Sequence, residues 1–194
     1  LLIMKYKIII LDTSTLGKYI SFEKFDSYGE VVHYEITKPE QTIERIANAE
    51  VLITNKVIIG EKEMDAAKNL KLICVAATGY NNIDIKAANE RNIIVANVKG
   101  YSTESVAQYV FAHILTVSNS VIEFQNQIKS NYWQQSAIFT SLCFPFNELK
   151  NKNLGIIGYG AIGKRVAEIG KVFGMNILIS NRKNTKTQSI ERIE

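Results

Sequence analysis

The chain has 194 residues, 46% of them hydrophobic and 22% charged, with a formal net charge of +4 at pH 7. This composition is typical of a soluble globular protein and excludes a disordered chain. The basic residues are scattered and do not alternate with aromatic residues, so the sequence predicts no binding of nucleic acid. No apolar run approaches the roughly 20 residues that span a membrane, so no membrane partner is expected.

Short apolar runs alternate with helical patterns through the first half of the chain. Five runs are expected to be strands: 6–11, 30–36, 51–54, 70–76 and 93–96. Helical patterns separate the later strands: 41–49, one that starts at Gly60, and 83–91. Strands that alternate with short helices in this way predict a parallel sheet that is covered on both faces. Helix caps are expected at Asp12-Thr13-Ser14 and at Asp84.

A different pattern begins at Tyr101. Apolar residues then recur at steps of three and four, which predicts one long helix from Thr103 to about Ile128. The segment from Asn131 to Leu149 is expected to be a loop, and it is rich in aromatic residues. Aromatic residues in a loop usually pack onto a neighbouring surface, such as that of a subunit partner.

The strongest motif of the chain is Gly158-Tyr-Gly160-Ala161-Ile162-Gly163, which lies between an apolar run and a helical pattern. Strand, turn and helix together predict a dinucleotide-binding β-α-β unit. In such a unit Gly158 permits the sharp turn, Gly160 lets a pyrophosphate approach the backbone, and Gly163 lets helix and strand pack closely. The helix that starts at Ala161 and Ile162 offers free N–H groups to the phosphates. The alternative is an ordinary glycine-rich turn in an α/β core.

The second strand of this unit is expected at 176–180, and Asn181 and Arg182 follow it. NAD-binding units carry an acidic residue near this point, about 20 residues after the glycines. Asn181 does not repel a phosphate, and Arg182 can pair with one. Both NAD and NADP are therefore expected to bind, with NADP favoured or at least not excluded, unless Arg182 only faces solvent. The polar residues 184–194 predict no further element, so the strand at 176–180 is expected to be an exposed edge.

Three segments resemble one known family: 72–84, 97–107 and 154–164. The family is that of the D-isomer-specific 2-hydroxyacid dehydrogenases, and the segment Ala77-Thr-Gly-Tyr-Asn-Asn-Ile-Asp84 is most similar to glycerate dehydrogenases (hydroxypyruvate reductases). The resemblance implies an α/β fold, with a flavodoxin-like substrate domain over 1–99 and the first half of a Rossmann domain over 100–194. It also implies an NAD(P)-dependent oxidoreductase that moves a hydride at the CH–OH group of a D-2-hydroxy acid of the glycerate/hydroxypyruvate or glyoxylate type.

The resemblance also implies where ligands bind. The backbone N–H groups of Thr78 and Gly79 are expected to hold the substrate carboxylate, and Thr103 is expected to touch the cofactor near the nicotinamide. Lys56 ends the third strand and can add a cation near that carboxylate. The alternatives are a plain strand-to-helix turn at 78–79, a helix N-cap at Thr103 and a solvated lysine at position 56.

No catalytic residue is assigned within the chain. The family's arginine, glutamate and histidine lie beyond the part that matches 176–194, so the 194-residue chain is expected to be inactive on its own. His33 and His113 are interpreted as structural, because neither has an acidic residue at a spacing that would place it alongside. No zinc-type spacing of Cys and His is present, so no metal site is expected.

The two cysteines, Cys74 and Cys143, are far apart in the sequence and are interpreted as reduced thiols of a cytoplasmic protein. The expected partner is a small 2-hydroxy or 2-oxo acid, and the complete protein is expected to be a homodimer. The alternative function is a non-catalytic NAD(P)-binding interaction module, or an inactive gene fragment.

Overall fold

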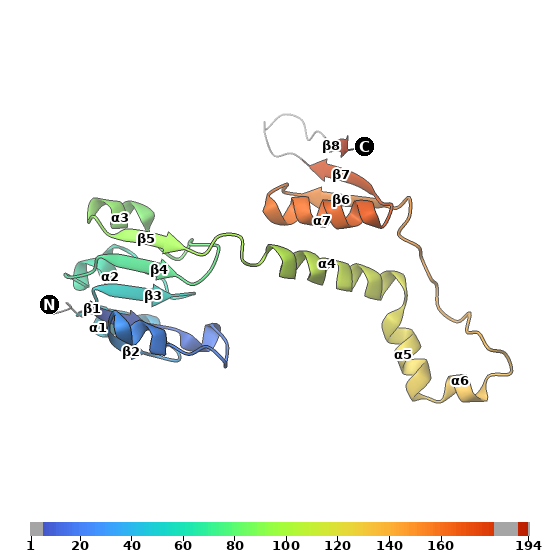
Figure 1. The fold of residues 1–194 in the computed structure, drawn as a ribbon, viewed down its shortest axis with the longest axis horizontal. Helices are drawn as coiled ribbons and strands as arrows, with labels where there is room; N and C mark the ends of the chain where they lie inside the picture. Colours follow the sequence, from blue (N-terminus) through green and yellow to red (C-terminus); the bar gives the residue numbers. More distant parts are fainter. Residues whose placement is uncertain (1–5, 181–189, 194) are drawn as a thin grey trace. The chain divides into compact units, whose positions relative to one another are not determined.

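The computed structural model describes residues 6–180 and 190–193. The chain forms two compact units, Leu1–Tyr101 (unit 1) and Ser102–Glu194 (unit 2). Figure 1 shows their elements, and each unit is described by itself below.

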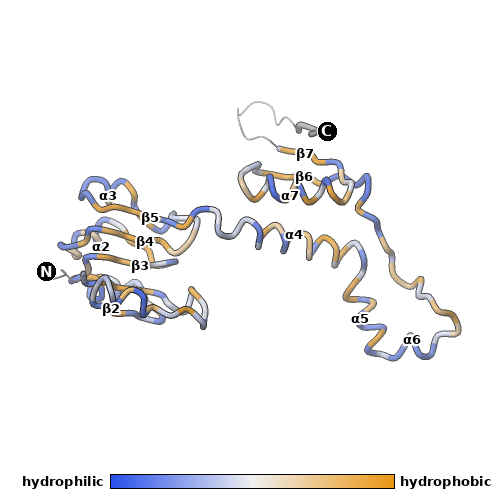
Figure 2. Tube along the Cα trace, viewed as in Figure 1, coloured by the Kyte–Doolittle hydropathy of each residue, from blue (hydrophilic) through white to orange (hydrophobic). Residues whose placement is uncertain are grey.

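Unit 1 is built on a five-stranded parallel sheet with the order β2-β1-β3-β4-β5. Its strands are β1 (Tyr6–Ile10), β2 (Gly29–His33), β3 (Val51–Thr54), β4 (Leu72–Val75) and β5 (Ile94–Asn97). Each of them overlaps a run expected to be a strand, although β2 begins one residue earlier, at Gly29, and β5 ends one residue later, at Asn97. Figure 2 shows β3, β4 and β5 as largely hydrophobic stretches. The order 2-1-3-4-5 is that of flavodoxin-like doubly wound sheets, which confirms the predicted fold class.

The two faces of this sheet are covered differently. The helices α1 (Pro39–Ile46), α2 (Glu61–Ala66) and α3 (Ile85–Glu90) contribute to the larger core, in which Ile9, Leu52 and Ile73 are almost fully buried. Alternate strand residues, such as Ile8, Ile10 and Ile53, form a second cluster with Leu16 and Phe22. Those two come from the β1–β2 connection, whose regular structure is two 3-10 helices, η1 (Thr13–Thr15) and η2 (Glu23–Ser27). This second face is therefore covered by a connection without an α-helix.

Asp12 does not cap a helix as predicted. No side chain caps η1, and Asp12 is only 4% exposed. Its carboxylate instead accepts hydrogen bonds from the backbone N–H groups of Asn55 (3.0 Å) and Lys56 (2.6 Å). Asp12 thus joins the carboxyl ends of β1 and β3. Asp84, by contrast, caps α3 as expected, because its carboxylate accepts a hydrogen bond from the N–H of Ala87.

Replacing Asp12 with alanine is expected to lower the free energy of unfolding by about 2 kcal/mol, because it leaves two backbone donors without their charged acceptor. Urea denaturation of the variant measures the change. Asp26→Ala is a matched control, since Asp26 lies in η2 and is exposed. Equal stability of the two variants would show that the Asp12 carboxylate is not a structural link.

Unit 2 contains a sheet with the order β6-β7-β8. The strands β6 (Asn153–Ile157) and β7 (Asn176–Ser180) are parallel, with α7 (Ala161–Val172) between them in the chain, as predicted. However, β8 (Ile190–Ile193) pairs with β7 in antiparallel orientation. The prediction that 176–180 is an exposed edge was wrong, because β7 lies between two strands. The missed strand has two charged residues among four, so no apolar run revealed it.

The predicted long helix is two helices, α4 (Thr103–Ser118) and α5 (Val121–Lys129). Between them Ser120 adopts the left-handed conformation (φ 47°), which a continuous α-helix cannot contain. The Ser120 hydroxyl donates a hydrogen bond to the carbonyl of Pro145 (2.8 Å), so a distant segment fixes the break. Of the two helices, α4 packs against α7 and the sheet through Ala107 and Phe111.

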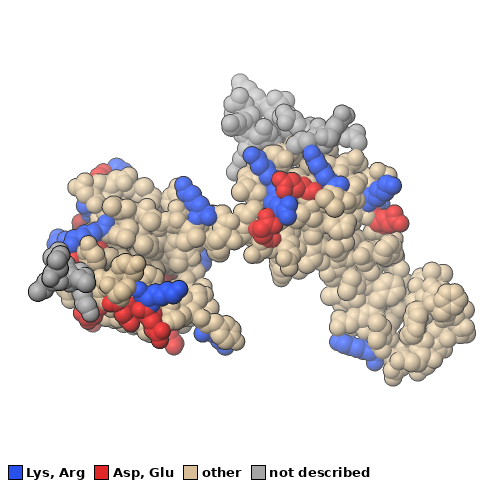
Figure 3. Space-filling model, viewed as in Figure 1, with Lys and Arg blue, Asp and Glu red and all other residues tan. Residues whose placement is uncertain are grey.

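The segment 121–146, here called the arm, exposes many apolar side chains. It holds α5, the short helix α6 (Tyr132–Gln135) and a loop, where only a loop was expected after residue 131. Phe139 is 93% exposed and Leu142 is 86% exposed, and Ile128, Trp133 and Phe146 are exposed as well. Figure 3 shows few charged side chains over this segment. Across the described residues, no helix combines the length and apolarity needed to cross a membrane.

Candidate functional site

The loop after β4 presents two free backbone donors. The N–H groups of Thr78 and Gly79 donate no hydrogen bond within the described part of the chain, and both residues are exposed. The loop itself is held in place, because Thr78 Oγ1 donates to the carbonyl of Val98 (3.0 Å) and Asn97 Nδ2 donates to the carbonyl of Thr78 (2.7 Å). A loop that is fixed by hydrogen bonds and leaves two N–H groups free can bind a carboxylate. It also lies at the carboxyl end of a strand, where doubly wound sheets bind their ligands.

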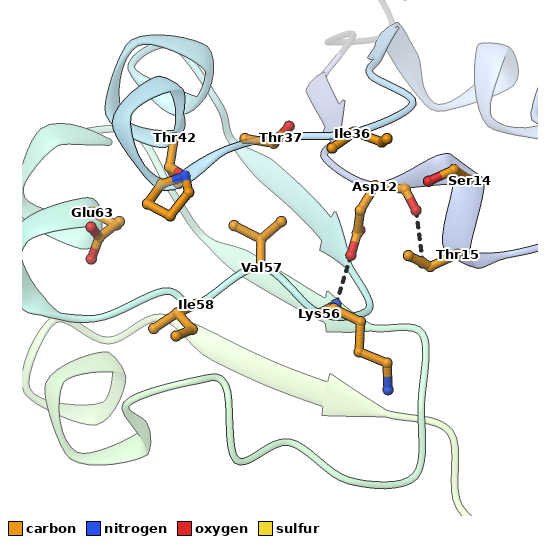
Figure 4. Close-up of a pocket in the computed structure, with 11 residues that line it drawn as sticks. Asp12, Ser14, Thr15, Ile36, Thr37, Thr42, Lys56, Val57, Ile58 and Glu63 are labelled. Carbon is orange, nitrogen blue, oxygen red and sulfur yellow. Dashed lines mark hydrogen bonds between the residues drawn. The ribbon is translucent and has the colours of Figure 1, made fainter.

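Lys56 lies at the carboxyl end of β3, beside a pocket of about 610 Å³. The pocket walls are largely apolar, with Ile36, Val57 and Ile58 among them. Figure 4 shows the Lys56 ammonium group pointing away from the other side chains that line this pocket. The exposed Lys56 side chain has no carboxylate within ion-pair distance in the described residues, so it is available to an anion outside the pocket. Its role beside the Thr78 loop stays a prediction.

The glycine turn between β6 and α7 has the geometry expected of a dinucleotide-binding motif. Gly158 has φ 92°, a conformation that side-chain-bearing residues rarely adopt. A Cβ on Gly163 would lie 2.3 Å from the carbonyl oxygen of Gly158, so helix and strand pack too closely for any other residue. By contrast, a Cβ on Gly160 would meet no atom within 4 Å, which leaves open space beside the turn.

The N-terminus of α7 is open to an anion. Gly160 is its N-cap residue, no side chain caps it, and its first turn contains no acidic residue. Its first residues, Ala161 and Ile162, are both exposed, Ile162 to 39%. Because the first N–H groups of a helix have no partner within the helix, these donors and the positive end of the dipole fit a phosphate group.

Two basic residues follow the third glycine, and they differ in their partners. Arg165 forms ion pairs with Glu168 and Glu104, both at 2.9 Å, and these carboxylates raise the pKa of Arg165. Lys164 forms no ion pair within the described residues, and its ammonium group lies 6.0 Å from the ring centroid of Tyr159. Lys164 is thus a cation near the phosphate-binding turn that the motif alone did not single out.

Three further residues, Thr103, Asn181 and Arg182, were predicted to contact the cofactor. The helix α4 begins at Thr103 and its N-cap residue is Ser102, so the alternative interpretation of Thr103 as the cap was wrong. Contact between Thr103 and the cofactor stays a prediction. Asn181 and Arg182 lie outside the described residues.

A sequence model of the D-isomer specific 2-hydroxyacid dehydrogenase catalytic domain matches residues 8–185. The chain belongs to this family. The resemblance carried by segments 72–84, 97–107 and 154–164 is therefore confirmed at the level of the family.

Curated relatives in this dehydrogenase family match the chain over most of its length. A hydroxypyruvate reductase of Blautia hydrogenotrophica is 32% identical over 176 residues, which cover 89% of this chain and 55% of the relative. A glycerate dehydrogenase of Methylorubrum extorquens is also 32% identical over 176 residues, covering 90% of this chain and 55% of the relative. The chain thus spans about half the length of the curated relatives it matches.

Solved structures give the same picture of the fold. An acyclic imino acid reductase in complex with NADPH and D-Arg has a TM-score of 0.76 and 25% identity, and the match covers 93% of this chain and 58% of the reductase. The NAD⁺-bound 3-phosphoglycerate dehydrogenase of Entamoeba histolytica has a TM-score of 0.64 and 29% identity, with 95% of this chain and 56% of that chain covered.

The two histidines of the chain each lie beside an aromatic ring. His33 lies against the ring of Phe22 (5.7 Å between centroids), and His113 lies edge-on to Tyr109 (4.4 Å). Both histidines are exposed. No cluster of three or more His, Cys, Asp or Glu side chains suited to a metal ion occurs among the described residues.

Proposed function

We propose that the complete protein is an NAD(P)-dependent oxidoreductase that acts on the CH–OH group of a D-2-hydroxy acid of the glycerate/hydroxypyruvate or glyoxylate type. Unit 1 is the substrate domain and unit 2 the cofactor-binding domain, close to the boundary expected between residues 99 and 100. The proposal rests mainly on the two free N–H groups of Thr78 and Gly79, which lie on a loop fixed by hydrogen bonds. It is supported by the membership of the chain in this dehydrogenase family.

The chemistry of the proposed reaction determines which groups the complete protein must provide. Reduction of a 2-oxo acid needs a hydride at the carbonyl carbon, a proton at the carbonyl oxygen and donors for the carboxylate. Thr78 and Gly79 supply backbone donors for the carboxylate, and the start of α7 holds the pyrophosphate of NAD or NADP. The bound nicotinamide supplies or accepts the hydride. The proton donor and the carboxylate-binding arginine are those that the family resemblance places outside residues 1–194.

The arm supports a homodimer of the complete protein. Its exposed apolar residues, Phe139 and Leu142 above all, form a surface of the kind that is normally covered by a partner. Sedimentation of the complete protein as a monomer at micromolar concentration would contradict this assignment.

A cytoplasmic location is part of the same proposal. Both cysteines are unpaired, and burial raises the pKa of the Cys74 thiol, as suits a structural residue in a reducing compartment. Localisation of the tagged protein outside the cytoplasm would count against it.

Steady-state assays test the proposed activity. We expect the complete protein to reduce hydroxypyruvate or glyoxylate with NADH or NADPH at about 1 s⁻¹ or faster. Residues 1–194 alone are expected to give no turnover, because the proton donor is missing. A complete protein that binds the nucleotide but reduces neither acid would favour the non-catalytic binding module instead.

The preference between the cofactors is tested separately. Asn181 and Arg182 predict that NADPH binds at least as well as NADH, since neither repels the 2′-phosphate. Titration of the complete protein with each cofactor gives the two dissociation constants. NADH binding that is about tenfold tighter, a difference of roughly 1.4 kcal/mol, would contradict the prediction.

A further inference from the structure

The two free N–H groups after β4 belong to two successive peptide groups, and the carbonyl of each is held. In the peptide group between Ala77 and Thr78, the carbonyl oxygen accepts a hydrogen bond from the N–H of Val98 (3.0 Å). In the next one, between Thr78 and Gly79, the carbonyl oxygen accepts a hydrogen bond from Nδ2 of Asn97 (2.7 Å). Asn97 is the last residue of β5 and Val98 follows it. Each peptide group with a free donor is thus anchored through its other polar atom.

These anchors determine where the two donors point. All peptide bonds of the described residues are trans, so the C=O and N–H bonds of one peptide group point in opposite directions. Both carbonyl groups point toward the end of β5, and the N–H groups of Thr78 and Gly79 therefore point away from it. Because β4 lies between β3 and β5, the donors face the side of β3, which has Lys56 at its carboxyl end. Successive N–H groups that face one way form a concave site for an anion.

The two anchors differ in kind, and only one of them is a side chain. The N–H of Val98 continues the hydrogen bonding between β4 and β5, so every residue type except proline can supply it. The contact of Asn97 with Thr78 requires a side-chain donor, which in asparagine is the amide nitrogen. The Thr78 hydroxyl also donates to the carbonyl of Val98 (3.0 Å), but this bond fixes the side chain and not the peptide group. The orientation of the Gly79 N–H therefore depends on Asn97.

Asn97 also affects the strength of this donor. The peptide group is conjugated, so a hydrogen bond at its carbonyl oxygen polarises the N–H bond at its other end. The Gly79 N–H becomes a better donor as a result. Both Thr78 and Gly79 are exposed, so a ligand can reach the two N–H groups, whereas the half-buried Asn97 acts on them from behind.

We infer that Asn97 is a positioning residue for substrate binding, which directs the Gly79 N–H at the carboxylate of the acid by holding the carbonyl of Thr78. The inference rests on the proposed function, in which that carboxylate binds at Thr78 and Gly79. The carboxylate takes no part in the hydride transfer and is bound equally before and during the reaction. Loss of Asn97 therefore raises KM and leaves kcat nearly unchanged. If Asn97 only stabilised the loop, its loss would lower stability without changing KM.

Steady-state kinetics of the complete protein test this with Asn97→Leu, which removes the donor and keeps the size of the side chain. We expect KM for hydroxypyruvate to rise about tenfold, the effect of one hydrogen bond to a charged group. The value of kcat should change by less than about threefold, and the dissociation constant of NADH should stay the same. Asn89→Leu is the matched control, since Asn89 is exposed on α3. An unchanged KM in Asn97→Leu, or a loss confined to kcat, would overturn the inference.

An NMR measurement on the 194-residue chain observes the peptide group itself. Thr78-Gly79 is the one Thr-Gly pair in this sequence. Threonine labelled with carbon-13 at the carbonyl and glycine labelled with nitrogen-15 therefore give a single correlated signal, that of the peptide group between them. D-Glycerate should shift this signal, and D-glyceramide, which has no carboxylate, should leave it unchanged. Asn97→Leu should need about tenfold more D-glycerate for the same shift.

The outcomes separate this inference from the proposed function. Equal responses of Asn97→Leu and the unmodified chain to D-glycerate would overturn the inference alone. The absence of a shift in the unmodified chain would overturn the carboxylate site and the inference together. If the NMR shifts are as expected but the complete protein reduces no 2-oxo acid, the proposed activity fails, and Asn97 stands as the positioning residue of a carboxylate site.

Discussion

Gly163→Ala is expected to destabilise unit 2 by about 3 kcal/mol, at the upper end of what overpacking usually costs. The added Cβ would stand 2.3 Å from the carbonyl oxygen of Gly158 and 3.2 Å from Cγ2 of Ile156. The nearer atom belongs to the backbone, so α7 has to move away from β6 as a whole. Because the phosphate-binding turn connects these two elements, nucleotide binding should be lost together with stability.

Chemical denaturation followed by titration with NADH measures both effects. Gly155→Ala is the matched control, since Gly155 lies in β6 and a Cβ there meets no atom within 4 Å. We expect the control to unfold and to bind as the unmodified chain does. A Gly163→Ala variant with unchanged stability would show that β6 and α7 are not packed as described.

Gly160→Ala is expected to keep the fold and to weaken nucleotide binding by about a hundredfold, roughly 2.7 kcal/mol. Gly160 has φ −81° and ψ −164°, an extended conformation that alanine adopts readily, and its Cβ would have open space. That space is where a pyrophosphate approaches the backbone at the start of α7. The methyl group therefore excludes the ligand without disturbing the protein.

Calorimetric titration with NADH, NADPH and ADP-ribose tests this, with the thermal transition as the check on folding. ADP-ribose carries the pyrophosphate without the nicotinamide, so all three ligands should weaken together. Unchanged affinity in Gly160→Ala would place the pyrophosphate elsewhere. A loss restricted to NADH and NADPH would point to the nicotinamide end instead.

Much of the fold could be predicted from the sequence, for a physical reason. Strands of a parallel sheet are buried on both faces and therefore appear as continuous apolar runs, as in β1 and β3. The glycine turn was equally visible, because Gly158 and Gly163 meet backbone requirements that no other residue type meets.

The failures have a common cause in contacts between distant parts of the chain. Apolar spacing continues across Ser120, so periodicity could not reveal a helix break that Pro145 stabilises. The four residues of β8 become a strand by pairing with β7, and they carry no apolar run of their own.

Within the candidate site, the sequence indicated residues that act through their backbone, and their contact with a substrate stays a prediction. The N–H groups of Thr78 and Gly79 could be singled out because the loop matches the family. The hydrogen bonds of Asn55 to Asp12 and Thr15 could not be predicted, because they join residues about 40 positions apart in the sequence. Such a network has no local pattern for sequence analysis to detect.

The sheet of unit 1 also bears on how the protein is made. All five strands lie between Tyr6 and Asn97, and the β1–β2, β1–β3, β3–β4 and β4–β5 pairings use no later residue. A ribosome adds about 5–20 residues per second, so the 57 residues from Ser102 to Gly158 take roughly 3–11 s to synthesise. Mixed α/β domains fold at rates between those of helical bundles (roughly microseconds to milliseconds) and those of all-β domains (roughly milliseconds to seconds). Unit 1 can therefore complete its sheet before the glycine turn of unit 2 has been translated.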